Sequence, residues 1–158
     1  MKGDTASGLL TAVLDMEEAY RDVAGRPEGT LGLLTGLLVE GTVLPPGVYT
    51  WTTVIQISGN IILRGGPFDT WIFRTTGDVI VWPGKRMKLE GGAAARNIVW
   101  QVAGYIRAEP ASHLEGTFLV KTACVFQAGA TLNGRLYAGT AVTLIQNTIT
   151  PPAALSWT

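Results

Sequence analysis

The side chains that could carry out acid–base, nucleophilic or metal chemistry are few in this chain and lie far apart. There is one histidine, His113, and one cysteine, Cys124. A general base needs a partner that orients it, and the sequence offers none near His113, so we expect a structural or solvated histidine. The acids between residues 41 and 116 stand singly, at Asp69, Asp78, Glu90, Glu109 and Glu115, and residues 117–158 contain none. Polysaccharide lyases and hydrolases need clustered carboxylates or a bound metal, so we expect no enzyme, no metal site and no cofactor.

Length and charge narrow the class of protein further. The chain has 158 residues, enough for a sizeable core, and we expect a single domain over residues 1–158. Twelve basic and twelve acidic residues cancel. Nucleic-acid binders need a basic footprint and peripheral membrane proteins a polybasic patch, so we expect neither partner. Charges or prolines interrupt every apolar segment, so no transmembrane run is predicted, and no N-terminal stretch has the form of a signal peptide.

One convincing helical pattern occurs, over about residues 4–24. Apolar side chains recur there at helical spacing, at Leu9, Val13, Met16, Tyr20 and Val23. Polar and mostly acidic residues occupy the opposite side, and Gly25-Arg26-Pro27 forms a strong stop. A helix with one apolar face should pack against another part of the protein.

Two neighbouring stretches near the C-terminus repeat each other with a shift of eighteen residues. Residues 117–134 align with residues 135–152, so that Thr122-Ala123 falls on Thr140-Ala141 and Cys124 on Val142. Looser copies begin upstream, near Trp71 and Ile98. An apolar-alternating repeat of this length is too short for a helical hairpin and fits one coil of a β-solenoid.

Short strands whose middle residue points outward support this interpretation. They are Ile55–Ile57, Ile61–Leu63, Val79–Val81, Met87–Leu89, Ile106–Ala108 and Val142–Leu144. Glycines, among them Gly116 and Gly134, punctuate them where corners are needed. Because one coil cannot bury its inner side alone, stacked coils must share a core. We therefore predict a mostly β protein: a parallel β-helix with coils over about residues 31–152 and the helix packed alongside.

The same alignment predicts a packing role for the cysteine. Cys124 falls in an inward column with Ile106 and Val142, so it should behave as a small core side chain. With no second cysteine in the chain, it cannot form an internal disulfide.

The tryptophans have two possible roles, as sugar-stacking platforms or as core. Trp71 and Trp100 occupy the same part of successive coils, beside Phe118, which predicts an internal aromatic stack. The sequence leaves Trp51 and Trp82 undecided between the two roles.

Several sequence phrases occur in a characteristic order. They are Leu14-Asp15-Met16-Glu17-Glu18-Ala19-Tyr20, Pro46-Gly47-Val48-Tyr49, Trp71-Ile72-Phe73, Leu89-Glu90-Gly91-Gly92-Ala93, Asn97-Ile98-Val99-Trp100-Gln101-Val102-Ala103-Gly104, His113-Leu114-Glu115-Gly116, Ala130-Thr131-Leu132-Asn133-Gly134-Arg135-Leu136 and Thr140-Ala141-Val142-Thr143-Leu144. This ordered set closely resembles the DUF3494 ice-binding protein family, over about residues 8–152. The resemblance implies an irregular three-faced β-helix with a long α-helix alongside. It also implies secretion, and adsorption to ice that inhibits ice growth and recrystallisation without catalysis.

The sequence departs from the family pattern at its start. In the family, further residues normally precede the helix and form a coil that docks next to the C-terminal coil, whereas this sequence starts at the helix. The coil over residues 135–152 is therefore expected to have an unpaired edge. A truncated product, a fragment, or self-association in which another copy closes the edge would each fit.

Ice-binding faces in the family are flat and carry outward Thr, Ser, Ala and Gly, often as Thr-Ala/Gly-x-Thr/Asn. The coil alignment predicts one outward column of Gln56, Ile80, Arg107, Val125 and Thr143. It predicts an adjacent column of small residues, namely Gly77, Gly104, Ala123 and Ala141, flanked by the hydroxyls of Thr76, Thr122 and Thr140. The resemblance thus implies ice contact by Thr76, Gly77, Gly104, Thr122, Ala123, Thr140, Ala141 and Thr143.

Arg107 is the main objection to an intact ice-binding face. A long, strongly hydrated cation in the middle of a flat surface carries its own water and opposes lattice order. Ile80 and Val125 also stand where Thr or Ser is usual in the family. A second interpretation therefore stays open: a structural or adhesive β-solenoid module of the same fold with a degraded ice-binding face.

Overall fold

The computed structural model describes residues 29–150. The helix predicted over about residues 4–24 lies outside these described residues. Within them there is no α-helix, only two short 3-10 helices, η1 (Leu33–Gly36) and η2 (Ala95–Asn97). No helix in this part of the chain is long and apolar enough to cross a membrane.

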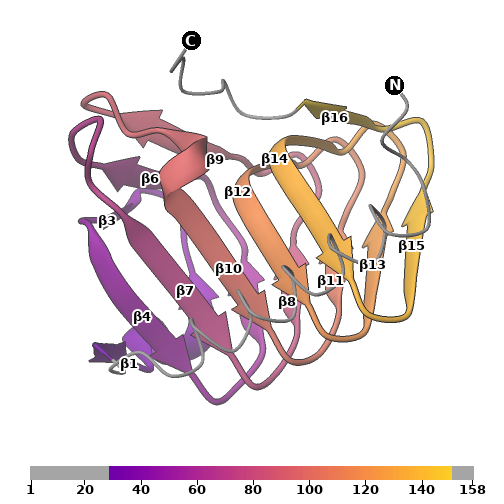
Figure 1. The fold of residues 1–158 in the computed structure, drawn as a ribbon, viewed down its shortest axis with the longest axis horizontal. Coiled ribbons are helices and arrows are strands. Elements are labelled where there is room, and N and C mark those ends of the chain that lie inside the picture. The colour runs from indigo at the N-terminus through magenta and orange to yellow at the C-terminus, as the bar shows by residue number, and fades with distance from the viewer. Residues whose placement is uncertain (1–28, 151–158) are drawn as a thin grey trace, which may run out of the picture.

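The described chain winds into three parallel sheets (Figure 1). The seven-stranded sheet contains β1 (Thr30–Leu31), β4 (Gly47–Trp51), β7 (Trp71–Thr75), β10 (Ile98–Val102), β12 (His113–Val120), β14 (Thr131–Ala138) and β16 (Thr148–Thr150). The six-stranded sheet contains β2 (Leu37–Leu38), β5 (Ile55–Ile57), β8 (Val79–Val81), β11 (Ile106–Ala108), β13 (Ala123–Phe126) and β15 (Ala141–Leu144). The three-stranded sheet contains β3 (Thr42–Leu44), β6 (Ile61–Arg64) and β9 (Met87–Glu90). The predicted parallel β-helix is confirmed.

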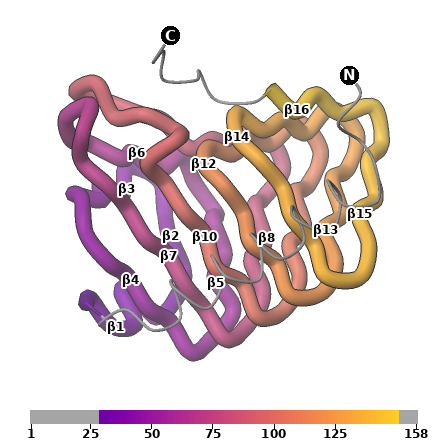
Figure 2. Tube along the Cα trace, viewed as in Figure 1, coloured from indigo at the N-terminus to yellow at the C-terminus, as the bar shows by residue number. Residues whose placement is uncertain are grey.

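The coils stack side by side along the long axis of the molecule (Figure 2). In the C-terminal half the repeat is eighteen residues, because Val99 pairs with Thr117 and Thr117 with Arg135. Upstream the coils are longer: Gly47 pairs with Trp71, and Trp71 with Ile98. The extra residues form loops outside the strands, which explains why the upstream copies are looser in the sequence.

Aromatic rings from successive coils stack inside the β-helix. Ring centroids are 5.2 Å apart for Tyr49 and Phe73, 4.3 Å for Phe73 and Trp100, and 5.3 Å for Trp100 and Phe118. The predicted stack was therefore wrong in one member, because the residue beside Trp100 is Phe73, while Trp71 pairs with Ile98. Each stacked pair contributes about 0.5–1.5 kcal/mol beyond the burial of its surface.

Two long strands, β12 and β14, turn a corner at a glycine. Their first halves continue the side of the three-stranded sheet, since His113 bridges to Arg86 just before β9. Their second halves belong to the seven-stranded sheet. Gly116 and Gly134 stand at the turn with φ of 118° and 155°. Their carbonyl and Cα groups stack so closely that a Cβ on Gly134 would lie 1.8 Å from the Gly116 carbonyl oxygen.

Candidate functional site

The six-stranded sheet carries the row of outward side chains that the sequence predicts. Its register places five residues side by side, and we call them the central row: Gln56, Ile80, Arg107, Val125 and Thr143. Their neighbours along each strand point into the core, where Ile55, Val79, Ile106 and Cys124 are fully buried. Adjacent strands lie about 4.8 Å apart, so the central row extends over about 19 Å.

The predicted column of small residues is displaced in the structure. Ala123 pairs with Ala141 across β13 and β15. The register of β11 with β13 brings Tyr105 beside Ala123, and that of β8 with β11 brings Asp78 beside Tyr105. The row next to the central row therefore consists of Asp78, Tyr105, Ala123 and Ala141. The alignment of the two glycines with the two alanines was therefore wrong by one position.

The two glycines stack instead on threonines, at the corner that leads into the six-stranded sheet. The backbone N–H of Gly104 donates to the carbonyl of Gly77, that of Thr122 to Gly104, and that of Thr140 to Thr122. We call these four residues the corner row. The Gly-Asp and Gly-Tyr pairs of the earlier coils thus correspond to the Thr-Ala pairs of the later ones.

Close packing explains the glycines of the corner row. A Cβ on Gly77 would lie 2.8 Å from the Thr53 carbonyl oxygen, and one on Gly104 would lie 1.9 Å from Oδ1 of Asp78. The corner also depends on Thr75, a buried residue that the sequence reading missed. Its hydroxyl donates to the Thr53 carbonyl at 2.5 Å and accepts from the Gly77 N–H at 2.9 Å. These glycines are required by the fold, whatever the surface binds.

The predicted hydroxyls differ in how available they are. Thr122 donates its hydroxyl to the Gly104 carbonyl at 2.7 Å, so that donor is used inside the corner. Thr140 and Thr143 are exposed on the last coil. Thr76 is also exposed, but it lies one residue before the corner row. Of the predicted ice-contact residues, those of the Thr-Ala-x-Thr pattern at residues 140–143 are therefore the most accessible.

Larger side chains occupy the middle of the same face. Tyr105 is 37% exposed, and Trp82, just after β8, is 41% exposed. The indole Nε1 of Trp82 donates to Oε1 of Gln56 at 3.2 Å. The side chain of Arg107 is 49% exposed, with its Nε 3.9 Å from Oε2 of Glu109. The face carries small side chains at β13 and β15. Toward β11 and β8 it carries larger side chains and the charge of Arg107.

The other two sides of the β-helix offer a different chemistry. On the seven-stranded sheet, several outward side chains are buried: Ile72, Arg74, Gln101 and Leu119 are 7%, 6%, 7% and 2% exposed. The outward side chains of Val48, Thr50, Val99, Thr117 and Tyr137 are half-buried, and that of Arg135 is exposed. The third side carries exposed charges, including Lys88 and an ion pair of 2.8 Å between Arg64 and Glu90. Among the described residues, the six-stranded sheet has an exposed stretch without charged side chains on β15, where Ala141 and Thr143 are exposed.

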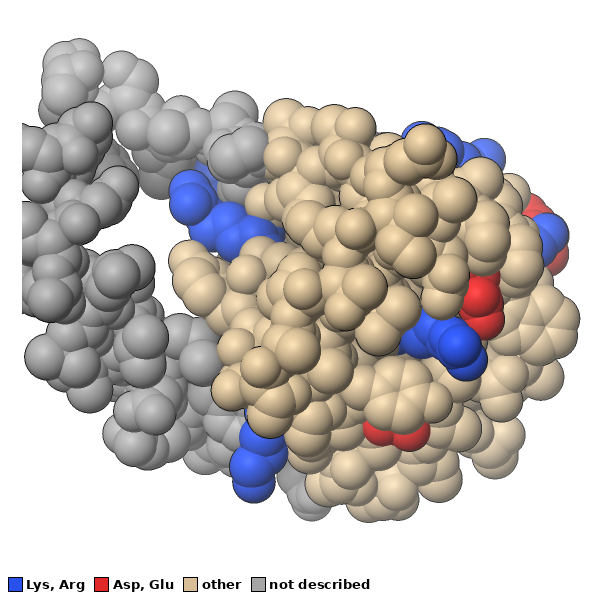
Figure 3. Space-filling view, turned by 90° about the vertical axis from the view of Figure 1, so that its right-hand side faces the viewer, with Lys and Arg blue, Asp and Glu red and all other residues tan. Residues whose placement is uncertain are grey.

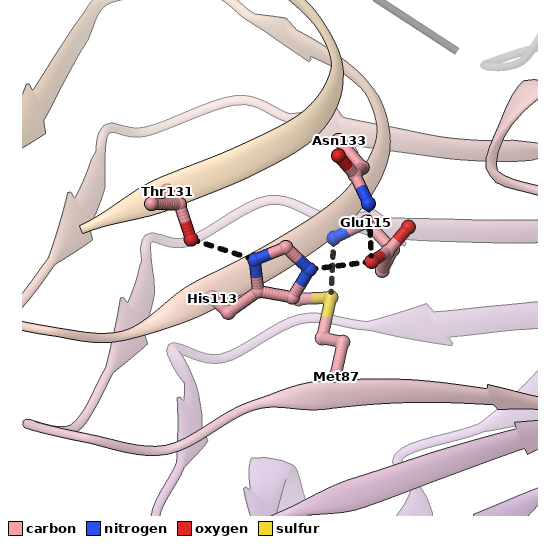
Figure 4. Close-up of polar contacts among 5 residues, drawn as sticks. All are labelled: Met87, His113, Glu115, Thr131 and Asn133. Carbon is pink, nitrogen blue, oxygen red and sulfur yellow. Dashed lines mark hydrogen bonds and ion pairs between the residues drawn. The ribbon is translucent and has the colours of Figure 1, made fainter. Parts of the chain in front are cut away.

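His113 has the partner that the sequence reading did not find (Figure 4). Its Nε2 lies 2.5 Å from Oε2 of Glu115, and its Nδ1 lies 2.7 Å from the hydroxyl of Thr131 on the next coil. Asn133 donates to the same carboxylate oxygen at 3.1 Å. The signal was present as a His-x-Glu spacing, because side chains two residues apart share one side of a strand.

This cluster ties coils together and lacks the surroundings of a hydrolytic site. The order Thr131, His113, Glu115 matches a nucleophile, base and orienting acid, and hydrolysis would also need open space and free backbone donors. His113 and Glu115 are only 8% and 7% exposed. The backbone N–H groups of His113 and Thr131 already donate to Lys85 and Ser112. The geometry is consistent with the structural histidine that we expected at position 113. The reason for that expectation was wrong, because His113 does have a nearby partner, Glu115.

The cysteine and the remaining titratable groups form no reactive site in the described chain. Cys124 is fully buried between its column neighbours Ile106 and Val142, as predicted. Burial raises the pKa of its thiol to about 12, which keeps it protonated and unreactive. No group of three or more His, Cys, Asp and Glu side chains in residues 29–150 could hold a metal ion. Of the tryptophans, Trp51, Trp71 and Trp100 are buried, which leaves Trp82 alone exposed among residues 29–150.

Comparison with known proteins identifies close sequence relatives. A family model described as Ice-binding-like matches residues 1–150. An ice-binding protein from Flavobacterium frigoris is 42% identical over 147 residues, which are 93% of this chain and 53% of that protein. One from a Colwellia species is 45% identical over 145 residues, covering 91% of this chain and 57% of the relative. The chain thus spans about half the length of these relatives.

Solved structures of ice-binding proteins share the fold. A glycosylated ice-binding protein from an Arctic yeast superposes with a TM-score of 0.93 at 31% identity, covering 98% of this chain and 67% of that one. The DUF3494 domain of an ice-binding protein from Shewanella frigidimarina gives a TM-score of 0.86 at 26% identity, covering 96% and 67% of the two chains.

Proposed function

The chain belongs to the ice-binding-like family, and we propose that it binds ice through the outward side of its six-stranded sheet. The observation that carries this proposal is the contrast between the three sides of the β-helix. On the seven-stranded sheet, most outward side chains are buried or half-buried, and the third side is charged. The six-stranded sheet is accessible and, at β13 and β15, free of charged side chains.

The proposed contact is concentrated on the last two strands of this sheet. Ala123, Ala141 and Thr143 lie on β13 and β15, and Thr140 leads into β15. Parallel strands at a spacing of about 4.8 Å present such side chains as a flat, regular array. Methyl groups and hydroxyls of small residues can order water on that array, and bridging waters bind almost as well as direct hydrogen bonds. An adsorbed protein then blocks the growth of the ice surface beneath it.

Ice recrystallisation inhibition by the purified chain tests this function. At micromolar concentration we expect smaller ice grains after annealing than in buffer alone. Circular dichroism and a cooperative melting curve serve as the control that the chain is folded. A folded chain that leaves grain growth unchanged would contradict the proposal and favour the structural or adhesive module.

We propose that the helix predicted over about residues 4–24 packs on the outer side of the seven-stranded sheet. Leu119 and Ile72 point away from the core there and are nevertheless buried, so that side needs an apolar cover. The apolar stripe from Leu9 to Val23 has matching chemistry. Replacing Leu119 with Glu should therefore lower the melting temperature clearly, whereas the same change at Val125, on the accessible sheet, should not. Equal effects would sink this placement.

Secretion stays a prediction from the family resemblance. A signal sequence in the upstream reading frame would support it, and a reading frame without one would oppose it.

A further inference from the structure

The larger side chains in the middle of the six-stranded sheet have no part in the proposed ice contact. Trp82 and Tyr105 are 41% and 37% exposed there. The sequence left Trp82 undecided between a core position and a sugar-stacking platform, and its exposure excludes the core position. Single exposed apolar side chains are common on proteins, so the case for a ligand depends on what surrounds the indole.

The indole of Trp82 is held in place and surrounded by polar side chains. Its Nε1 donates to Oε1 of Gln56 at 3.2 Å, which leaves the amide NH2 group of Gln56 as a donor. The register of β5, β8 and β11 places Ser58 on one side of Trp82 and Glu109 on the other. Arg107 lies diagonally across, on β11. A ring that is already held in one orientation loses little conformational entropy when it binds a ligand.

The two charged groups beside the indole offset each other and can still form hydrogen bonds. Nε of Arg107 lies 3.9 Å from Oε2 of Glu109, a distance that is too long for a hydrogen bond. The described surface at the C-terminal end of the stack also carries few charged side chains (Figure 3). Attraction of a charged partner needs a field of one sign, so these groups fit an uncharged ligand with hydroxyl groups better.

A second aromatic ring lies on the same face, at the start of β11. Glu109, which lies beside Trp82, follows Tyr105 by four residues. At about 3.3 Å per residue, the two rings are therefore about 13 Å apart along the strands. The half-buried Ile80 lies between them on β8. We call this surface the aromatic track, and it consists of Trp82, Ile80 and Tyr105 with the polar side chains of Gln56, Arg107 and Glu109.

We propose that the aromatic track binds an extended, uncharged polysaccharide whose pyranose rings form a flat ribbon, as in cellulose. The hydroxyl groups of such a ribbon point sideways, and the axial C–H groups form two apolar faces. These C–H groups carry small positive charges and stack favourably on the negative face of an aromatic ring. The hydroxyl groups then meet the amide of Gln56, the guanidinium of Arg107 and the carboxylate of Glu109. A flat sheet suits a straight chain better than a helical one such as starch.

The aromatic track lies on β5, β8 and β11 and does not depend on the proposed ice contact, which lies on β13 and β15. Arg107 opposes an ordered ice lattice but suits this ligand, because its guanidinium can donate several hydrogen bonds to hydroxyl groups. The six-stranded sheet would then carry two neighbouring binding surfaces of different chemistry.

Isothermal titration calorimetry with cellohexaose tests the aromatic track. We expect a dissociation constant of about 1 mM or lower, because two stacked rings and a few hydrogen bonds must offset the cost of association. Maltohexaose has the same number of glucose units in a helical chain and should bind at least tenfold more weakly. Trp82→Ala should weaken cellohexaose binding at least tenfold, and Trp82→Phe, which keeps a ring, should recover part of the affinity.

Phe68→Ala is the matched control, since Phe68 is an aromatic side chain with 86% exposure in the loop between β6 and β7. This variant should bind cellohexaose as the wild-type chain does, and melting curves check that each variant is folded. The inference would be overturned by a folded wild-type chain that gives no binding heat at about 10 mM cellohexaose. Equal affinity for the two sugars, or equal losses in Trp82→Ala and Phe68→Ala, would also overturn it.

Ice recrystallisation inhibition by the same proteins separates the aromatic track from the ice contact. We expect Trp82→Ala to keep its inhibition, because Trp82 lies outside β13 and β15. Inhibition without cellohexaose binding would overturn only the aromatic track. Cellohexaose binding without inhibition would support the track and contradict only the proposed ice contact.

Discussion

At the level of single residues, the proposed face is set by the contrast between β15 and β11. Thr143 and Arg107 occupy equivalent positions in the central row, two strands apart. A methyl and a hydroxyl add little height to the sheet, whereas a guanidinium on a long stem projects from it and holds its own hydration water. The ion pair with Glu109 is long and exposed, so it does little to hold that side chain down.

Arg107→Thr should therefore increase ice recrystallisation inhibition. The change removes the charge and continues the threonine chemistry of β15 toward the middle of the sheet. The measurement is the lowest protein concentration that still arrests grain growth, and we expect it to fall. Arg135→Thr, a similar change on β14 outside the six-stranded sheet, is the control and should leave it unchanged. A loss of activity in Arg107→Thr would contradict the assigned role of the central row.

Cys124 gives a prediction about alkaline stability. Burial raises the pKa of its thiol from 9.0 to about 12, so the unfolded chain releases this proton at lower pH than the folded one. The resulting stabilisation is fully present below about pH 9 and is lost as the pH rises toward 12. Within that window the loss amounts to about 1.4 kcal/mol per pH unit.

Cys124→Val, which copies the side chain of Val142, removes this loss. The free energy of unfolding of the wild-type chain should fall more steeply with pH than that of the variant, as measured with denaturant at about pH 8 and about pH 10. Burial also raises the pKa of Tyr49, but that residue is present in both proteins and cancels from the comparison. Parallel pH dependences would show that the thiol is not held protonated by burial.

At the level of the elements, the corners of the coils impose the strictest demands on the sequence. Gly134→Ala should destabilise the fold by at least about 2 kcal/mol, because a positive φ and a clash with the Gly116 carbonyl act together. Gly84→Ala is the matched control: its φ is also positive, at 72°, but nothing lies within 4 Å of the added Cβ. We expect about 1 kcal/mol there. Thermal and denaturant unfolding would decide, and equal losses would argue against the stacked corner.

The elements also show how far sequence reasoning reaches. Alternation of apolar residues predicted the strands and the central row, because each strand must place every second side chain in the core. It misplaced Gly77 and Gly104 by one position. The positions of these corner residues are set by backbone hydrogen bonds between coils, and the alternation of apolar and polar side chains does not apply to them. The contact of His113 with Thr131 depends on which coils lie next to each other, so the sequence could not predict it. The two-residue spacing could have predicted only the contact of His113 with Glu115.

At the level of the whole molecule, the coil stack converts a short repeat into a surface. No single coil offers more than a few small side chains, and their parallel register aligns them across neighbouring strands. Because the aligned surface is best developed on the last two coils, its area is small for a single chain.

The most direct test of ice binding through the six-stranded sheet is the activity of Ala141→Tyr. Ala141 is exposed on β15, so a tyrosine should leave the melting temperature nearly unchanged while it breaks the flatness of the face. Lys88→Tyr places the same side chain at an exposed position of the three-stranded sheet and serves as the control. We predict that ice recrystallisation inhibition is abolished in Ala141→Tyr and kept in Lys88→Tyr. Full activity in a folded Ala141→Tyr protein would show that ice is bound elsewhere.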